Sequence, residues 1–251
     1  MVKSRCRECD RNEQGLSASS LKKTGTAWSL NAGRRERLVS EVCARLRAEY
    51  GLPRLGNPTD PVEDLVFIML SNRTRPLAAA STFALLRARY ESWEEMAAAP
   101  LGEVIGILEP IGLQSKRASQ IRSALVAIRT DFGVCTLKPL ESRSEADVLV
   151  YLMRLDGVSE KVAKCVMMYT MGAAVLPVDA HVHRVASRLG WTARRRPDQC
   201  SAELEALVPA EARYGLHVGC IEHGRSVCRP RRPRCSSCVI ADLCPYDLEH
   251  Q

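Results

Sequence analysis

The chain has 251 residues, a net charge of +7 and 46% hydrophobic residues. This length and apolar content suffice for one large domain or two small ones, and they exclude a wholly disordered protein. The positive charge favours an anionic partner. No run of about 18 uncharged apolar residues occurs, and the N-terminal residues lack the apolar segment of a secretory signal, so we expect neither a membrane span nor export.

Taken in chain order, the pattern predicts an all-α protein of about ten short helices. Residues 1–35 are polar without a hydrophobic period, and we predict a flexible N-terminal segment. From residue 36 onward apolar residues recur at helical spacing, and almost nothing alternates as a strand would. Helices are expected over 62–70, 76–90, 101–108, 115–131 with Ser115 as its cap, from Ser144 onward, over 159–171, and over 179–189 before Gly190.

The segment 155–163, LDGVSEKVA, joins two of these helices. Gly157 permits a positive φ in a tight turn, and Ser159 can cap the following helix. Such a turn directs backbone N–H groups outward at the positive end of a helix, which favours phosphate binding. Many helical hairpins use glycine, however, so the turn alone is weak evidence of nucleic-acid binding.

Two side chains near this turn could perform chemistry. Lys161 lies two residues after the expected cap, where the helix dipole disfavours a cation and so favours the nucleophilic neutral amine. Asp179 follows a Leu-Pro-Val entry segment. Local sequence by itself favours simpler interpretations, in which Lys161 is a surface lysine and Asp179 merely caps its helix.

The chain has 11 cysteines, and four of them crowd together near the C-terminus with the spacing C-x6-C-x2-C-x5-C. Four clustered thiolates can hold a tetrahedral metal or the corners of an iron–sulfur cube. The wide first gap favours a [4Fe–4S] cluster over zinc. We interpret the isolated cysteines (43, 135, 165, 200 and 220) as small buried apolar residues, and the pair Cys6 and Cys9 as non-functional.

Arginine is concentrated inside this cysteine motif. Of the 36 basic residues 29 are Arg, and the first two cysteines of the motif enclose the sequence RPRRPR. A loop tethered to a metal centre and stiffened by proline would hold its guanidinium groups out toward phosphates. The alternative is an ordinary solvated run of charge.

Together these motifs resemble the endonuclease III family of helix-hairpin-helix DNA glycosylases. The resemblance runs from about Pro61 to Tyr246 and includes, in family order, PIGLQSKRASQI, LDGVSEKVA, LPVDAHVHRVASRLG and the four-cysteine motif. It implies a six-helix lobe over residues 58–173, which contains the hairpin. It also implies a cluster lobe formed by residues 36–57 together with 174–251, with duplex DNA bound between the lobes.

The resemblance also implies roles for individual residues. Lys161 matches the family's nucleophile, Asp179 its essential aspartate, and Cys228, Cys235, Cys238 and Cys244 its cluster ligands. Leu113 matches the residue that wedges into the duplex when a damaged base is flipped out. Further DNA contacts are expected at Gln114, Lys116, Gly157, Ser159, Arg229, Arg231, Arg232 and Arg234, and substrate contacts at Asn72, Arg73 and His181.

Two departures from the family pattern affect these expectations. Asp156 and Ser159 replace a proline and a glycine of the usual hairpin, so an acidic group lies beside the expected phosphate contact. The segment SNRTRP at 71–76 lacks the usual glutamine that fills the space of the flipped base, which leaves that place to Asn72 or Arg73. The second departure bears on substrate choice more than on activity.

The leading hypothesis is a glycosylase with AP-lyase activity that removes oxidised pyrimidines from duplex DNA, acting as a monomer. In a bacterial cell it would work in the cytoplasm at the nucleoid. The second hypothesis is a mismatch or modified-base glycosylase that acts on thymine, uracil or methylcytosine. An adenine glycosylase is a weaker hypothesis. A non-catalytic iron–sulfur DNA-binding or redox-sensing protein is the alternative from another functional class.

Overall fold

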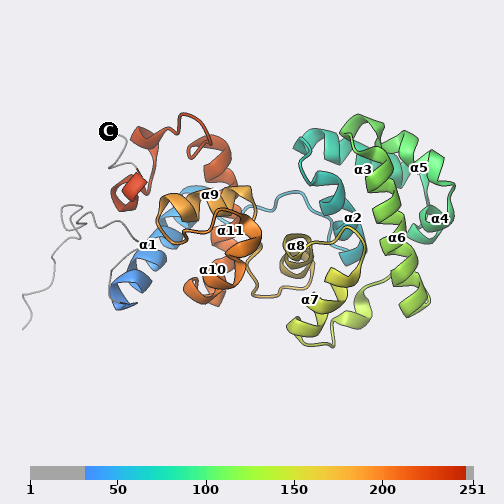
Figure 1. Ribbon diagram of the computed structural model, residues 1–251, viewed down its shortest axis with the longest axis horizontal. Coiled ribbons are helices and arrows are strands. Elements are labelled where there is room, and N and C mark those ends of the chain that lie inside the picture. The colour runs from blue at the N-terminus through green and yellow to red at the C-terminus, as the bar shows by residue number, and fades with distance from the viewer. Residues whose placement is uncertain (1–31, 247–251) are drawn as a thin grey trace, which may run out of the picture.

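A computed structural model describes residues 32–246, and within that range the chain forms eleven α-helices and no strand (Figure 1). The predicted all-α class is confirmed for this part of the chain. The helices are α1 (Ala32–Tyr50), α2 (Pro61–Ser71), α3 (Pro76–Arg89), α4 (Trp93–Ala98), α5 (Leu101–Leu108), α6 (Gln114–Phe132), α7 (Glu145–Arg154), α8 (Glu160–Thr170), α9 (Ala180–Arg188), α10 (Ser201–Leu207) and α11 (Arg213–Ser226).

The predicted flexible N-terminal segment, residues 1–35, overlaps the first helix. Residues 1–31, with Cys6 and Cys9, lie outside the described residues, but residues 32–35 are not a flexible segment because α1 begins at Ala32. The charged residues 34–37 are good helix formers, and they continue directly into the apolar face that starts at Leu38. None of the helices in the described part of the chain is long and apolar enough to cross a membrane.

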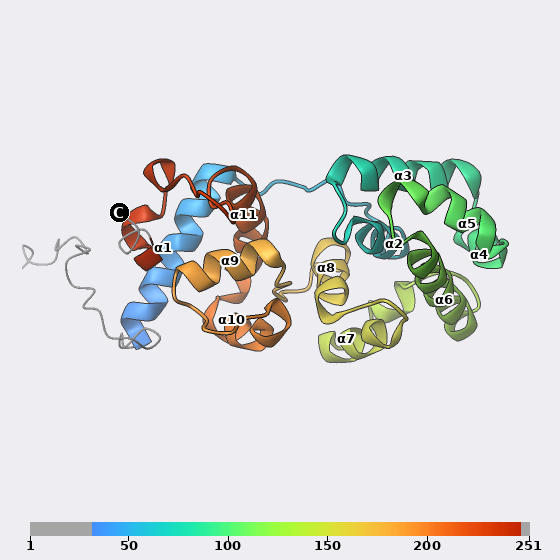
Figure 2. The ribbon, with the colours of Figure 1, turned by 45° about the horizontal axis from the view of Figure 1, so that its top comes forward.

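The apolar side chains form two separate cores. One is built from residues between 62 and 175, and the other from residues 38–46 together with residues 176–243. Helices α2–α8 accordingly form one group and α1, α9, α10 and α11 another, with α8 on the side facing α9 and α10 (Figures 1 and 2). The lobe boundaries implied by the resemblance stay a prediction.

Side-chain caps define where several helices begin. Asp60 accepts hydrogen bonds from Val62 N and Glu63 N at 2.9 and 3.1 Å, and Ser144 accepts one from Asp147 N at 3.1 Å. The predicted cap at Ser115 is wrong, because α6 begins at Gln114 and its N-cap residue is Leu113. The N-cap residue Leu113 has a left-handed backbone and makes no side-chain cap hydrogen bond. The preference of serine for the N-cap position therefore does not decide where α6 begins.

Polar contacts join α8 to the second group of helices. Lys164 of α8, 3% exposed, binds Glu205 of α10 at 2.8 Å and Ser201 at 2.7 Å. Tyr169, two turns further along α8 from Lys161, contacts Nε2 of His217 on α11 at 2.6 Å. These buried contacts fix α8, and with it Lys161, relative to α10 and α11.

Candidate active site and cysteine cluster

The turn before α8 has the conformation that the hairpin sequence predicts. Gly157 has a φ of +78°, and an added Cβ there would lie 2.8 Å from the Gln120 side chain and 3.0 Å from Met69. Ser159 caps α8 through a 3.5 Å hydrogen bond from Val162 N. Glycine is therefore required at position 157 both for backbone conformation and for the close packing of α2 and α6 against the turn.

Asp156, which replaces the proline of the usual hairpin sequence, contacts the neighbouring helix α6. Gln120 of α6 donates to its carboxylate through a 3.4 Å hydrogen bond. The side chain therefore helps to join the turn to α6, a role that the sequence did not suggest. The carboxylate remains exposed beside the N-terminus of α8.

Lys161 is the second residue of α8 and is partly exposed. The other lysine of this helix, Lys164, is buried and paired with both Glu160 and Glu205 at 2.8 Å. Lys161 itself forms no ion pair with a carboxylate of residues 32–246. A lysine held in a salt bridge keeps its proton, so Lys161 is the better placed of the two to act as an amine nucleophile.

Asp179 does cap its helix, as the simpler interpretation held. Its Oδ1 accepts hydrogen bonds from the backbone N–H groups of His181 and Val182 at 2.9 and 2.8 Å. The cap uses one carboxylate oxygen and directs the charge to the N-terminus of α9, so a catalytic use of the other oxygen remains available. Asp179 and Lys161 both act electrostatically on buried His217, so both charges lie in the neighbourhood of that ring.

A buried chain of hydrogen bonds holds the segment that leads into Asp179. His217 contacts the carbonyl oxygen of Pro177 through Nδ1 at 2.9 Å and the Tyr169 hydroxyl through Nε2 at 2.6 Å. Burial lowers the pKa of His217 to about 4, so the ring is neutral at pH 7. Because a carbonyl only accepts, Nδ1 donates to Pro177 and Nε2 accepts from Tyr169, which defines the tautomer.

His181 follows Asp179 and packs against the next helix. Its Nδ1 lies 3.1 Å from Nη2 of Arg184, which donates to the Gly224 carbonyl of α11 at 3.0 Å. A Cβ at Gly224 would lie 2.4 Å from His181 and 2.6 Å from Arg184. The two helices can therefore approach this closely only with glycine at position 224.

Three residues other than glycine have a positive φ within residues 32–246, namely Arg73 at 57°, Leu113 at 52° and Arg232 at 52°. All three belong to the predicted DNA or substrate contacts. Such conformations cost free energy and tend to persist at functional sites. Leu113 is also 63% exposed, which is unusual for a leucine and matches a residue that meets a ligand.

One contact that the sequence did not reveal joins two of these turns. Arg117 of α6 is buried, and its guanidinium donates to the carbonyl oxygens of Leu70 and Asn72, the latter at 2.6 Å. Arg117 thereby ties the start of α6, which follows Leu113, to the turn that contains Arg73. Gln114 is partly buried at the start of α6, and Lys116 and Asn72 are exposed.

The arginine-rich loop lies outside the second core. Its four predicted DNA contacts are all exposed, at positions 229, 231, 232 and 234. Arg188 of α9 holds the main chain of the loop, because it donates to the carbonyl oxygens of Arg229 and Pro230 at 2.9 and 3.2 Å. These main-chain bonds leave the loop guanidinium groups directed to solvent.

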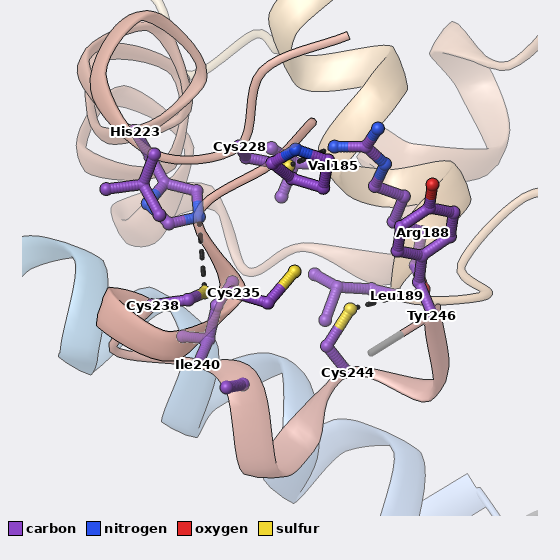
Figure 3. A pocket seen from close by; sticks show the side chains of 13 residues that line it. Val185, Arg188, Leu189, His223, Cys228, Cys235, Cys238, Ile240, Cys244 and Tyr246 are labelled. Carbon is purple, nitrogen blue, oxygen red and sulfur yellow. Dashed lines mark hydrogen bonds between the residues drawn. The ribbon is translucent and has the colours of Figure 1, made fainter. Parts of the chain in front are cut away.

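The four clustered cysteines line one pocket of about 370 Å³ next to α9 and α11 (Figure 3). All four are partly buried, and Figure 3 shows the sulfur atoms of Cys235 and Cys244 turned toward the interior of the pocket. Apolar side chains such as Val185, Leu189 and Ile240 complete the wall. Of the isolated cysteines, Cys135 is partly buried and the other four are buried, in line with their interpretation as small apolar residues.

Two side chains contact the cysteine sulfurs. Arg188 donates to Sγ of Cys228 at 3.1 Å, and its guanidinium also lies 4.4 Å from the centre of the Tyr246 ring. Nε2 of His223 lies 3.5 Å from Sγ of Cys238, and its Nδ1 lies 2.9 Å from the Tyr50 hydroxyl. Hydrogen bonds to thiolate sulfurs stabilise their charge and tune the centre that they hold.

The donor set fits an iron–sulfur cluster better than a single metal ion. Within the described residues, no three His, Cys, Asp or Glu side chains converge closely enough to hold one ion. The four thiol groups instead surround a cavity, which suits a larger object with one sulfur ligand at each corner.

Two family models match the chain. One, described as "HhH-GPD superfamily base excision DNA repair protein", matches residues 66–210, more than half of the chain. The other, described as the iron–sulfur binding domain of endonuclease III, matches residues 228–244, from the first to the last cysteine of the pocket. The expected [4Fe–4S] cofactor is thereby confirmed.

Sequence relatives include endonuclease III of Thermotoga maritima, 28% identical over 84% of this chain and 92% of that protein. Endonuclease III of Escherichia coli K12 is 29% identical over 82% of this chain and 94% of that protein. Among solved structures, a trapped endonuclease III–DNA covalent intermediate matches with a TM-score of 0.73 and 25% identity, over 88% of this chain and 99% of that one. A thermostable thymine-DNA glycosylase matches with a TM-score of 0.71 and 21% identity over 86% of this chain and 98% of that one, a likeness of fold alone.

Proposed function

The chain belongs to the HhH-GPD superfamily of base excision DNA repair proteins, and we propose that Lys161 is the nucleophile of its DNA glycosylase and AP-lyase reaction. The observation that carries this proposal is the contrast between the two lysines of α8. Lys164 is buried in ion pairs, whereas Lys161 stands partly exposed at the start of the helix without a carboxylate partner in the described chain.

The proposed reaction begins when the neutral amine of Lys161 attacks C1′ of the flipped nucleotide. A C–N bond forms, and the glycosidic bond breaks with its electron pair leaving on the base, which takes up a proton. Opening of the sugar gives a Schiff base between Lys161 and C1′. The Schiff base acidifies the neighbouring C2′ hydrogen, so loss of that proton expels the 3′ phosphate by β-elimination.

Asp179 would stabilise the positive charge that develops on the sugar as the base departs. Its Oδ1 is engaged by two backbone N–H groups, so the carboxylate is held in one orientation. A fixed carboxylate requires little reorganisation during the reaction, which is the condition for effective electrostatic catalysis.

We propose that duplex DNA contacts the three turns with positive φ. Leu113 would enter the base stack, Arg73 would occupy the space left by the flipped base, and Arg232 with its neighbours would bind the phosphate backbone. The hairpin N–H groups around Gly157 and Ser159 would bind a further phosphate. In a bacterial cell these contacts would place the protein, as a monomer, on chromosomal DNA in the cytoplasm.

The cluster would be held by Cys228, Cys235, Cys238 and Cys244. When bound, a [4Fe–4S] cluster can supply electron-transfer chemistry, but base displacement by Lys161 and β-elimination need none of it. Arg188 contacts both Cys228 and the carbonyl groups of the arginine loop. We therefore assign the cysteine pocket the task of fixing that loop for phosphate binding.

The test compares single-turnover excision by three variants of the cluster-loaded protein. Lys161→Ala should abolish strand cleavage, and Asp179→Asn should slow it by a factor of about 10²–10³, the range found when one group that stabilises transition-state charge is removed. Lys138→Ala, which removes an exposed lysine outside the site, should match the unmodified protein. Undiminished cleavage by Lys161→Ala would contradict the proposal.

Oxidised pyrimidines are the proposed substrates, and one observation favours a second class. Arg73 projects from a strained, exposed turn where a glutamine is usual, and a guanidinium could pair with the orphaned guanine opposite thymine or uracil. Duplexes containing thymine glycol, G·T, G·U and 5-methylcytosine separate the two classes. Fastest excision of thymine glycol supports the first, and fastest excision from G·T or G·U supports the second.

A further inference from the structure

The segment between α8 and α9, which leads into Asp179, crosses from one core to the other without regular secondary structure (Figure 2). Val175 packs in the first core, whereas Leu176 and Val178 pack in the second. Buried backbone N–H and C=O groups outside helices need partners from elsewhere in the fold. In this segment two adjacent residues receive those partners from side chains of the second group of helices.

Glu205 of α10 connects this segment to the helix that carries Lys161. One carboxylate oxygen, Oε1, accepts a 2.6 Å hydrogen bond from Leu176 N, and the other, Oε2, binds Nζ of Lys164 at 2.8 Å. Lys164 lies one turn after Lys161 on α8. Leu176 lies three residues before Asp179. A single carboxylate therefore bridges the helix of the proposed nucleophile and the approach to the proposed catalytic aspartate.

His217 of α11 makes a second bridge of the same kind. Its Nδ1 donates to the carbonyl oxygen of Pro177 at 2.9 Å, and its Nε2 accepts from the hydroxyl group of Tyr169 at 2.6 Å. Tyr169 belongs to α8, and Pro177 directly follows Leu176. The two bridges therefore come from different helices, and each joins one side chain of α8 to one backbone group of the same dipeptide.

We propose, on the basis of the function proposed above, that Glu205 and His217 are positioning residues of the glycosylase reaction. Together they hold Lys161 and Asp179 at the separation that base displacement requires. Neither bridging side chain exchanges a proton or contacts the DNA in this role, because each acts through the hydrogen bonds that it makes to α8 and to the backbone. The segment between the cores is then a rigid connection and not a hinge.

The physical case begins with what a buried ion pair contributes. Lys164 is 3% exposed, and the cost of removing two charges from water offsets most of their attraction, so such a pair adds little net stability. Lys164 has a carboxylate partner within its own helix, Glu160, at 2.8 Å. That partner alone would balance the charge of Lys164. The additional bond to Glu205 is the one that fixes α8 relative to α10.

The proposed reaction depends on precise placement across this boundary. Displacement of the base requires the amine of Lys161 at C1′ and the carboxylate of Asp179 near the charge that develops on the same sugar. Helix α8 packs in the first core and α9 in the second, so contacts between the cores determine how the two groups lie relative to one another. A misplacement of about 1 Å can slow a reaction by about 10²-fold.

The experiment compares two rates in the cluster-loaded protein. One is single-turnover excision from whichever of the four duplexes named above the unmodified protein cleaves fastest, and the other is borohydride trapping on a duplex with an abasic site. An abasic site already presents an aldehyde, so trapping needs the amine of Lys161 but not the help of Asp179 in base departure. Misplacement of the two groups should therefore slow excision far more than trapping, whereas a loss of folded protein would lower both rates in the same proportion.

Glu205→Gln tests the first bridge, because an amide has one accepting oxygen and can serve only one of the two present donors. The matched control is Asp131→Asn, which changes another bridging carboxylate. Asp131 accepts from the Tyr151 hydroxyl at 3.0 Å and pairs with Arg154 at 2.5 Å, and these contacts join α6 to α7. We expect Glu205→Gln to slow excision about ten- to a hundredfold relative to Asp131→Asn. Trapping, and affinity for a duplex with a non-reactive abasic analogue, should be unchanged.

Tyr169→Phe tests the second bridge, and it also covers the case in which Glu205→Gln does not fold. It removes only the hydroxyl group that contacts His217. Tyr214→Phe is its control, because the two rings are neighbours with centroids 6.4 Å apart and the Tyr214 hydroxyl donates to the carbonyl oxygen of Pro53 instead. We expect Tyr169→Phe to lower the ratio of the excision rate to the trapping rate, and Tyr214→Phe to leave that ratio unchanged.

Two results would overturn the proposal. If Glu205→Gln and Tyr169→Phe match their controls in both rates, neither bridge sets the geometry of the site. If both rates fall in the same proportion, together with a lower midpoint of urea unfolding, the bridges serve stability alone. Failure of the proposed function is a separate outcome, because the unmodified protein would then form no adduct at all.

Discussion

The guanidinium of Arg117 lies 2.6 Å from the carbonyl oxygen of Asn72, and this bond joins the two turns whose side chains are proposed to enter the DNA duplex. The Arg73 turn ends α2 and the Leu113 turn begins α6, so they are distant in sequence. A single buried side chain sets their spacing. Base flipping requires a wedge and a filling residue at matched positions, which is what this bond would maintain.

Arg117→Lys should therefore impair base flipping without removing the charge. A lysine cannot donate to several carbonyl oxygens in the fork geometry of arginine, and leaving buried carbonyl groups unsatisfied costs about 1–3 kcal/mol each. We expect slower single-turnover excision and a lower free energy of unfolding. Excision is measured by rapid quench and unfolding by urea titration.

Arg122→Lys provides the matched control on the same helix. Within residues 32–246, the Arg122 side chain makes one hydrogen bond, to the carbonyl oxygen of Ala97 at 2.9 Å, away from both turns. It should leave the excision rate close to that of the unmodified protein. An Arg117→Lys variant that excises as fast as Arg122→Lys would contradict the positioning role of Arg117.

Gly157→Ala should destabilise the hairpin by about 2–4 kcal/mol, through a positive φ and a steric clash that add together. The added Cβ would meet Gln120 and Met69 within 3.0 Å. Gly133→Ala is the control, because Gly133 has a similar φ of +82° and no other described residue beyond its chain neighbours lies within 4 Å of the added Cβ. It should cost only about 1–2 kcal/mol. Equal losses for the two variants, measured by urea unfolding, would show that packing at the hairpin is unimportant.

Gly224→Ala should loosen the cluster. Its Cβ would displace His181 and Arg184, and Arg184 also donates to the Cys228 carbonyl oxygen at 2.8 Å. We expect a lower iron and sulfide content per chain and faster bleaching of the brown colour in air. Gly102→Ala, in a helix with open space around the added Cβ, should retain the cluster fully. Full retention in Gly224→Ala would contradict this account of the pocket.

Asp64→Asn should remove a pH dependence of stability. The pKa of Asp64 is about 7 in the folded protein and 3.8 ordinarily, so the folded state binds its proton more tightly. The contribution of Asp64 to stability is therefore lost as pH rises from about 4 to 7, by a few kcal/mol at most. The variant should gain stability relative to the unmodified protein across that window.

Urea unfolding at several pH values checks this gain. Burial lowers the pKa of His217 and His223 to about 4, which destabilises the folded state as pH falls over much the same range. Both proteins share that effect, so the difference between them isolates Asp64. A difference that does not change with pH would show that Asp64 has an ordinary pKa.

The sequence predicted those features that depend on local chemistry. Glycine and serine in the hairpin, the cap at Ser144 and the ranges of α2, α3 and α5 follow from propensity, spacing and proline positions, and the structure agrees with them. Helix α11 was not predicted, because its three glycines and polar residues obscure a helical period. Gly219 and Gly224 serve close packing against α1 and α9, which a single sequence does not display.

The contacts made by Arg117 and Asp64 could not be predicted for a related reason. Arg117 contacts residues 45 to 48 positions away, and in the sequence it is one arginine among 29. Asp64 reads as an ordinary first-turn acidic residue of a capped helix. Only the packed structure reveals that this carboxyl is fully buried. Propensity governs element boundaries, whereas burial is a property of the assembled fold.

The role of Lys161 as nucleophile is tested most sharply by locating its covalent bond to the sugar. The cluster-loaded protein is reduced with borohydride on a duplex that contains thymine glycol, digested with nuclease and protease, and sequenced by mass spectrometry. We expect a sugar remnant on Nζ of Lys161, and no adduct in Lys161→Ala. A remnant on Lys164, on another lysine or on the N-terminal amine would contradict it.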